Sequence, residues 1–143
     1  MSIQTITINQ VFDAPLKQVF ATLSDHEKLG EICGITMKRV KDGAEQLNGL
    51  GSVREIYIGA LPPFQETICK FIENEKIEYK ITKGSPIKNH LGVLVFSQDK
   101  NKTYLRYTIQ LESRIPLTTF LIKTILSIGI KNGLKNYART LRK

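Results

Sequence analysis

Four polar side chains stand among apolar ones at alternating positions of predicted strands: Arg54, Glu66, Tyr79 and His90. A charged group that faces an apolar interior is costly unless it is paired. Arg54 and Glu66 are therefore expected to bind each other or a ligand. Two interpretations stay open: a structural ion pair, and a polar clamp that orients a carboxyl, carbonyl or hydroxyl group of an otherwise apolar ligand.

Glu66 and His90 are the candidate catalytic residues if the protein is an enzyme. A histidine has a pKa near working pH, so His90 could take a proton alpha to a ketone while Arg54 stabilises the enolate oxygen. The alternative is a histidine whose ring nitrogens simply bind a hydroxyl group or water. Tyr79 and Tyr107 could donate hydrogen bonds into a cavity, or belong to an ordinary aromatic core.

The remaining histidine and the cysteines give less information about function. His26 lies in a polar run and is expected to be exposed, and Cys69 is expected to be a buried, inert thiol. With two histidines and no CxxC pair, no metal site is expected, and without a phosphate-binding glycine loop no cofactor is expected either. Reduced cysteines and the lack of a signal peptide at the start of the sequence predict a cytoplasmic location.

These side chains need strands and helices that hold them on one wall. An early strand is predicted at 3–12. Two short helices follow it, one over 15–23 and one that begins after Asp25 and ends near Gly30. Beyond Gly34, segments with a period of two are separated by turn residues and predict an antiparallel meander: 35–41, 52–59, 64–73, 76–83, 89–98 and 103–112.

A long helix is predicted from Pro116 to about Leu141. Gly129 and Gly133 in its middle mark a bend or a close approach to another element. Only this helix is long enough to cover the apolar face of the sheet, and a curved sheet around a helix leaves a gap for small apolar ligands. Its apolar residues are expected on one broad side: Leu117, Phe120, Leu121, Ile125, Ile128, Leu134, Tyr137, Ala138 and Leu141.

The composition predicts one globular domain over 1–143. Hydrophobic residues make up 41% and charged residues 24%, which excludes a disordered chain. The longest apolar stretch, 115–130, is too short and too polar for a membrane-spanning helix. The net charge is +8, and residues 114–143 hold seven of the 21 basic side chains and none of the 13 acidic ones. This asymmetry favours either peripheral contact with an anionic membrane or a solvated helix face; no motif indicates nucleic acid, which is not expected as a partner.

The chain resembles the START/Bet v 1-like helix-grip superfamily (SRPBCC), and especially its bacterial polyketide cyclase/dehydrase and lipid transport group. The resemblance covers nearly the whole chain and includes Phe12-Asp13-Ala14-Pro15, Gly51-Ser52-Val53-Arg54-Glu55 and Gly84-Ser85-Pro86-Ile87-Lys88-Asn89-His90. It implies an α+β fold: a seven-stranded curved antiparallel sheet that grips a long C-terminal helix over a cavity, with two short helices after the first strand. Gly59-Ala60-Leu61-Pro62-Pro63 resembles the gate loop of related plant hormone receptors, whose latch string is not kept here.

Alternation along the strands, with the expected cavity, gives the candidate ligand-binding residues: Arg54, Ile56, Ile58, Phe64, Glu66, Ile68, Tyr79, Ile81, His90, Leu94, Tyr107 and Ile125. The mostly aliphatic set favours binding of a small hydrophobic ligand (a lipid, polyketide or isoprenoid-like molecule) by a carrier or sensor. One alternative is a cyclase or dehydratase-type enzyme that acts on a polyketide-like or aromatic substrate, and whether there is catalysis stays open. Another is an interaction module whose cavity is filled by its own side chains.

Overall fold

The computed structural model describes residues 3–85, 87–112 and 116–142, apart from the side chains of 116–119 and 122. The elements follow the predicted order, which confirms the α+β fold class. Their bounds are β1 (Gln4–Phe12), α1 (Leu16–Ser24), α2 (His26–Cys33), β2 (Thr36–Lys41), β3 (Val53–Tyr57), β4 (Phe64–Ile72), β5 (Lys76–Lys83), β6 (Lys88–Asp99), β7 (Lys102–Glu112) and α3 (Pro116–Thr140).

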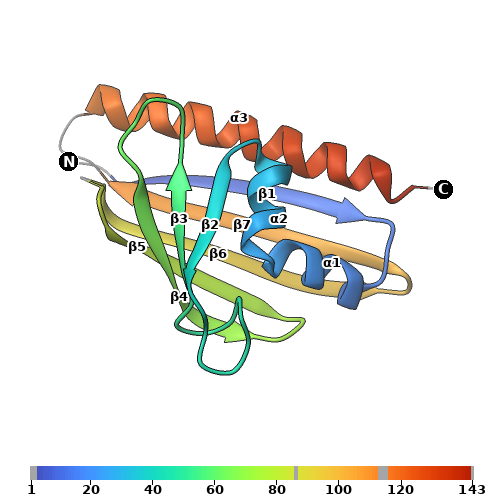
Figure 1. Cartoon of the computed structure of the whole chain (residues 1–143). Helices are drawn as coiled ribbons and strands as arrows, with labels where there is room; N and C mark the ends of the chain where they lie inside the picture. The colour runs from blue at the N-terminus through green and yellow to red at the C-terminus, as the bar shows by residue number, and fades with distance from the viewer. Residues whose placement is uncertain (1–2, 86, 113–115, 143) are drawn as a thin grey trace.

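The strands form one curved antiparallel sheet in the order β1-β7-β6-β5-β4-β3-β2 (Figure 1). Strands β2 to β6 each pair with the next strand along the chain, as the predicted meander requires, and β1 forms the far edge beside β7. The register between β4 and β5 shifts at Ile68/Lys70. Such a bulge takes one residue out of the alternation. It leaves Cys69 exposed, so the prediction of a buried Cys69 was wrong.

Helix α2 begins where it was predicted and ends later. Asp25 caps it as expected, since its carboxylate accepts a hydrogen bond from the Lys28 amide at 3.1 Å. The helix continues past Gly30 to Cys33 and ends at Gly34, whose left-handed backbone (φ 76°) suits glycine. Gly30 instead lies where α2 crosses β2. His26, the first residue of α2, is buried rather than exposed, because its ring enters the polar cluster described below.

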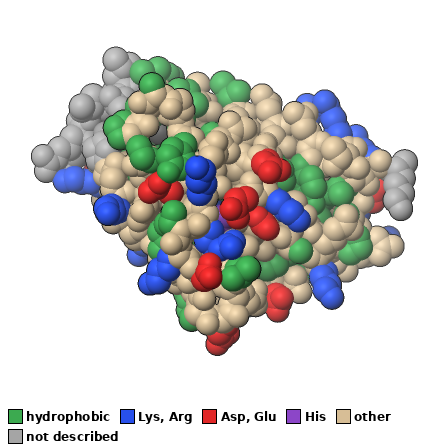
Figure 2. Space-filling view, in the orientation of Figure 1, with side chains coloured by type: hydrophobic (Ala, Val, Ile, Leu, Met, Phe, Trp, Pro, Cys, Tyr) green, Lys and Arg blue, Asp and Glu red, His purple; other side chains and the backbone are tan. Residues whose placement is uncertain are grey.

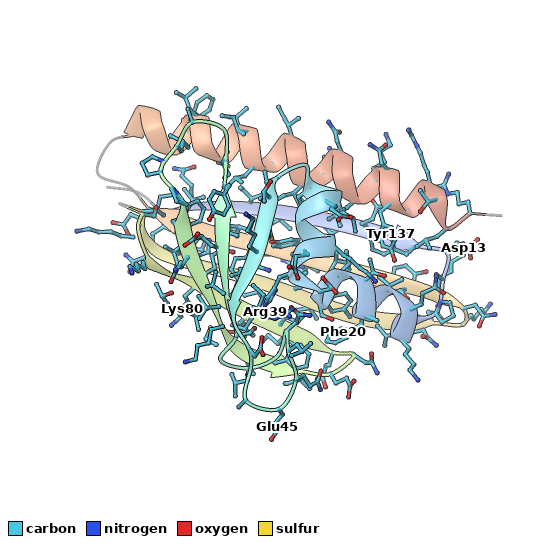
Figure 3. All side chains as sticks on the ribbon, in the orientation of Figure 1. Asp13, Phe20, Arg39, Glu45, Lys80 and Tyr137 are labelled. Atoms are coloured by element: carbon cyan, nitrogen blue, oxygen red, sulfur yellow. The ribbon has the colours of Figure 1, made fainter. Side chains whose placement is uncertain are left out.

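Helix α3 crosses one face of the sheet and has β1 and α2 as its closest neighbours (Figure 1). Its C-terminal half is the packed half: Leu134 and Ala138 are buried, and Tyr137, labelled in Figure 3, brings its ring to 5.4 Å from the ring of Phe12. Gly133 permits a close approach to α2, because a Cβ there would lie 1.9 Å from the carbonyl oxygen of Ile32. Of the two roles predicted for this glycine, the structure shows the close approach.

The N-terminal half of α3 corrects the prediction of one continuous buried side. Phe120, Leu121, Ile125 and Ile128 are each more than half exposed. This half passes over a cavity in the sheet's face, and its Lys123 Nζ donates to Gln4 Oε1 of β1 at 3.4 Å. The side chain of Leu117 lies outside the described residues, as do Pro86, Arg114 and Lys143. Within the described part of the chain, no helix is both long and apolar enough to cross a membrane.

The crossing at Gly133 predicts a contrast between two substitutions in one helix. Glycine-to-alanine changes inside helices usually stabilise by up to about 1 kcal/mol. At Gly133 the new methyl group collides with the Ile32 carbonyl, so Gly133→Ala should lower the urea midpoint of unfolding. Gly129→Ala is the matched control, because its Cβ would lie 3.4 Å from the nearest atom, the Cys33 carbonyl oxygen. That variant should keep or raise the midpoint; equal effects at both positions would contradict the crossing.

Candidate functional site

A cavity of about 380 Å³ lies between the sheet and the N-terminal half of α3. Such a volume is in the range of small-molecule sites. Nine of the twelve predicted ligand-binding residues line it. The apolar ones are Ile56, Ile58, Phe64, Ile81 and Ile125, and the polar ones are Glu66, Tyr79, His90 and Tyr107.

Three predicted residues are absent from the cavity wall. Ile68 and Leu94 are about 1% exposed and are enclosed by other core side chains, so their inward direction leads into packed core. Arg54 is buried behind Glu66. Alternation identifies the face of a strand but not the point along it where packing gives way to open space, and this explains the errors.

The sequence analysis also missed part of the wall. Cys33, Ile35 and Met37 contribute from the end of α2 and from β2, and Leu126 and Ile130 contribute from α3. The spacing of two between Ile35 and Met37 was a usable signal. No comparable signal indicated which side of α3 faces the cavity. Loop residues complete the wall: Leu61, Pro62, Gly84, Ser85 and Ile87.

The buried ion pair between Arg54 and Glu66 is fixed by strand register. The two residues are direct partners on β3 and β4, and Arg54 Nε donates to Glu66 Oε1 at 2.8 Å. The Arg54 guanidinium also lies over the Tyr79 ring, 4.3 Å from its centroid. Burial alone would lower the pKa of Arg54, but the nearby Glu66 charge outweighs it and the pKa is raised. Arg54 therefore stays charged at the base of the cavity.

His26 extends this cluster toward α2. Arg54 has only donors, so the Nη1–H donates to His26 Nδ1 at 3.4 Å, and His26 Nε2–H then donates to the hydroxyl of Ser52 at 2.9 Å. Burial, with the charges of Arg54 and Arg39, lowers the pKa of His26 from 6.5 to about 3. The ring is neutral at pH 7, and it supports the guanidinium from the side away from the cavity.

His90 is held in one tautomer by the backbone. The ladder between β5 and β6 ends at the pair Tyr79 and Gly92. Beyond it, the Ile81 amide donates to His90 Nδ1 at 3.1 Å. Burial lowers the pKa of His90, although the Glu66 charge partly opposes this. The neutral ring therefore carries its proton on Nε2, which lies 3.7 Å from Glu66 Oε2.

Two tyrosine hydroxyls complete the polar end of the cavity. Tyr79 and Tyr107 hydrogen-bond to each other through their hydroxyl groups, and burial raises the pKa of both. Gly92 makes room for the Tyr79 ring, since a Cβ at this position would lie 2.1 Å from it. The described residues include no group of three or more side chains that could hold a metal ion. The arrangement thus offers one carboxylate oxygen, one imidazole N–H and a tyrosine pair at the end of an apolar chamber.

Neutral, buried His26 predicts a loss of stability in mild acid. Its pKa is about 3 in the folded state and 6.5 when unfolded, so the unfolded state binds more protons between these values and stability falls as the pH drops below 6.5. Between about pH 7 and pH 5 the free energy of unfolding should lose about 2 kcal/mol through His26. Urea unfolding at each pH measures it. His26→Gln should show a smaller change over the same interval, and an unaltered pH dependence would contradict this assignment.

No family model and no curated protein matches the sequence. Solved structures are similar. The Zhui aromatase/cyclase from Streptomyces sp. R1128 has a TM-score of 0.74 at 14% identity, over 96% of this chain and 94% of that one. Norcoclaurine synthase from Thalictrum flavum, in complex with dopamine and hydroxybenzaldehyde, has a TM-score of 0.70 at 9% identity, over 99% of this chain and 90% of that one. A protein from Nitrosospira multiformis has a TM-score of 0.71 at 18% identity, over 98% of this chain and 97% of that one. With one seven-stranded antiparallel sheet and a long C-terminal helix across it, the chain has the helix-grip fold of the START/Bet v 1-like superfamily.

Proposed function

We propose that this protein binds a small hydrophobic molecule in the cavity between the sheet and α3, as a carrier or sensor. The observation that carries the proposal is the cavity itself, about 380 Å³ of space with a wall that is aliphatic and aromatic except at one end. Apolar surface that a ligand covers there is removed from water, which is the main source of affinity in such sites. At about 30 Å³ per water-sized group, the space suits roughly a dozen such groups.

The cavity reaches the surface beside the β3–β4 loop. Leu61 and Ile125 line the cavity and are both more than half exposed, so they mark where the wall meets solvent. Leu61 belongs to the segment that resembles a gate loop. A mobile loop at such a position regulates access to the interior. Free Cys33 and Cys69 support a reducing, cytoplasmic setting for this activity.

We further propose that the outer face of α3 docks on an anionic membrane. Leu121, Ile128 and Lys135 are exposed and lie seven residues apart, close to two helical turns, so they follow one line along the helix. Arg142, also exposed, lies two residues beyond the end of α3 at Thr140. This line is apolar beside the cavity and basic toward the C-terminus. Figure 2 shows hydrophobic side chains at the upper left and basic ones at the upper right of this edge. Apolar insertion combined with basic contacts is how peripheral helices bind anionic bilayers.

A second candidate function is a cyclase or dehydratase-type activity, favoured by Glu66 and His90 on one cavity wall. Because Nδ1 of His90 accepts from Ile81, the neutral ring offers a proton and not a lone pair to the cavity. In an enzyme, Glu66 would then be the base and His90 the hydrogen-bond donor to a ketone oxygen. Native mass spectrometry separates the two functions: a carrier returns an added ligand unchanged, and an enzyme returns a cyclised or dehydrated product.

Filling the cavity should abolish ligand binding. The neutral dye N-phenylnaphthylamine fluoresces in apolar surroundings, so its emission reports binding in the cavity. Ile81→Trp adds bulk to the cavity wall and should lower dye affinity by about tenfold or more, because the space is shared. Ile72→Trp, on an exposed site of β4, is the matched control and should bind as the unmodified protein does. Lack of dye binding by the unmodified protein, or equal binding by Ile81→Trp, would refute the cavity as the ligand site.

Membrane docking predicts a dependence on both lipid charge and the line along α3. The protein should pellet with vesicles of phosphatidylcholine and phosphatidylglycerol, and much less with phosphatidylcholine alone. Each basic group near an anionic surface contributes about 1 kcal/mol, so the pair Lys135→Glu and Arg142→Glu should weaken binding by roughly tenfold or more. Lys80→Glu with Lys100→Glu, two exposed sites away from α3, is the control. Indifference to phosphatidylglycerol, or a stable dimer that buries Leu121, would overturn the docking proposal.

A further inference from the structure

We infer that the ligand carries a neutral hydroxyl group, as an alcohol or a phenol does, and that Glu66 and His90 bind this hydroxyl together at the inner end of the cavity. The inference rests on the proposed function and deepens it, because it names the chemical class of the ligand. It depends on two polar atoms whose hydrogen-bonding roles are fixed by their other partners.

The first atom is His90 Nε2, which is a donor. The Ile81 amide occupies Nδ1 from the backbone side, at 3.1 Å. A neutral imidazole has one donor and one acceptor nitrogen, so Nε2 must carry the proton. Burial and the charge of Arg54 act against a second proton on this ring, as the lowered pKa of His90 indicates. The ring therefore offers the cavity an N–H that needs an acceptor.

The second atom is Glu66 Oε2, which is an acceptor. Its sister atom Oε1 accepts from Arg54 Nε at 2.8 Å within a buried ion pair. Oε2 lies 3.7 Å from His90 Nε2. That separation is too long for a hydrogen bond. A donor and an acceptor thus stand side by side on the cavity wall, and neither satisfies the other.

A hydroxyl group is the smallest group that satisfies both atoms. Its oxygen accepts from His90 Nε2–H while its proton is donated to Glu66 Oε2. A ketone or an ether accepts from His90 but leaves Glu66 without a donor. A carboxylate has no proton to donate and brings a second negative charge against Glu66. An ammonium group pairs with Glu66 but turns its N–H groups toward the N–H of His90.

The tyrosine pair does not change this preference. One hydroxyl of Tyr79 and Tyr107 donates to the other, which leaves one O–H as a further donor near the site. Both are held protonated by burial. The described polar groups on the cavity wall therefore include several donors but only one charged acceptor, the Glu66 carboxylate. A ligand that supplies a proton to that acceptor gains most, since a hydrogen bond to a charged group is stronger than one between neutral groups.

The test compares ligands of equal chain length. Decanol, decyl methyl ether, decanoate and decylammonium are titrated against the protein loaded with N-phenylnaphthylamine, and dye displacement gives each affinity. Decanol should bind at least about tenfold more tightly than the ether, in which a methyl group replaces the hydroxyl proton, and than decanoate. Decylammonium should bind more weakly than decanol. Comparison of the alcohol with the ether needs no variant, so it does not depend on whether a mutated protein folds.

A substitution that replaces the carboxylate with a neutral amide then reverses the preference. In Glu66→Gln the amide oxygen takes the place of Oε1 toward Arg54, and the amide NH₂ faces the cavity beside His90. The wall then offers donors alone, so decanoate should gain affinity relative to decanol. Glu55→Gln is the matched control, because Glu55 lies next to Arg54 on β3 but binds Tyr57 and Gln65 instead of the cavity. It should leave the order of affinities unchanged.

The outcomes separate the inference from the proposed function. If the dye binds in the cavity but decanol, the ether and decanoate displace it equally, hydroxyl recognition is wrong and apolar binding stands. If decanoate binds best to the unmodified protein, hydroxyl recognition is likewise wrong. If neither the dye nor any of the four ligands binds, the proposed function itself fails.

Discussion

The ion pair between Arg54 and Glu66 is the constraint on which the polar end of the cavity depends. Two opposite charges in an interior require each other and further hydrogen bonds, and strand register supplies the first requirement by placing them directly across β3 and β4. The Arg54 guanidinium also hydrogen-bonds to His26 and lies over the Tyr79 ring. Glu66 then has one oxygen committed to Arg54 and one directed to the open side. An ion pair that would be costly in a closed core here holds a hydrogen-bond acceptor, Glu66 Oε2, in place at the end of an apolar cavity.

The cavity exists because the C-terminal half of α3 packs on its neighbours more closely than the N-terminal half does. The C-terminal half packs on β1 and α2 through Leu134, Ala138 and the close crossing at Gly133. The N-terminal half has no comparable support and passes over the strands that carry Glu66 and His90. A sheet with this curvature cannot meet a straight helix along its whole length. Toward α1 the interior is filled by aromatic side chains, because the ring of Phe20, labelled in Figure 3, makes edge-to-face contacts with those of Phe71 and Phe96.

Much of the fold could be predicted from the sequence, because the patterns that specify it involve residues that are close together in the chain. Turn residues and two-residue alternation act between neighbours, so the meander and the pairing of Arg54 with Glu66 could be predicted. The predictions that were wrong concern features that depend on packing between residues far apart in the sequence. The burial of His26 follows from a guanidinium 28 positions away in sequence, and the exposure of Leu121 and Ile128 follows from which side of α3 faces away from the sheet. Ile68 and Leu94 share the predicted face with Ile56, yet only Ile56 reaches open space.

The contact of Gly133 with the Ile32 carbonyl has a mechanical consequence. A small rotation of α3 about this crossing would displace its residues in proportion to their distance from it. Ile125 lies eight residues from Gly133, or about 12 Å along the axis at 1.5 Å per residue. A tilt of about ten degrees at the crossing would shift that part of α3 by about 2 Å, roughly the half-width of a methylene chain. A small rotation of α3 of this kind would widen or narrow the cavity without separating any strands of the sheet.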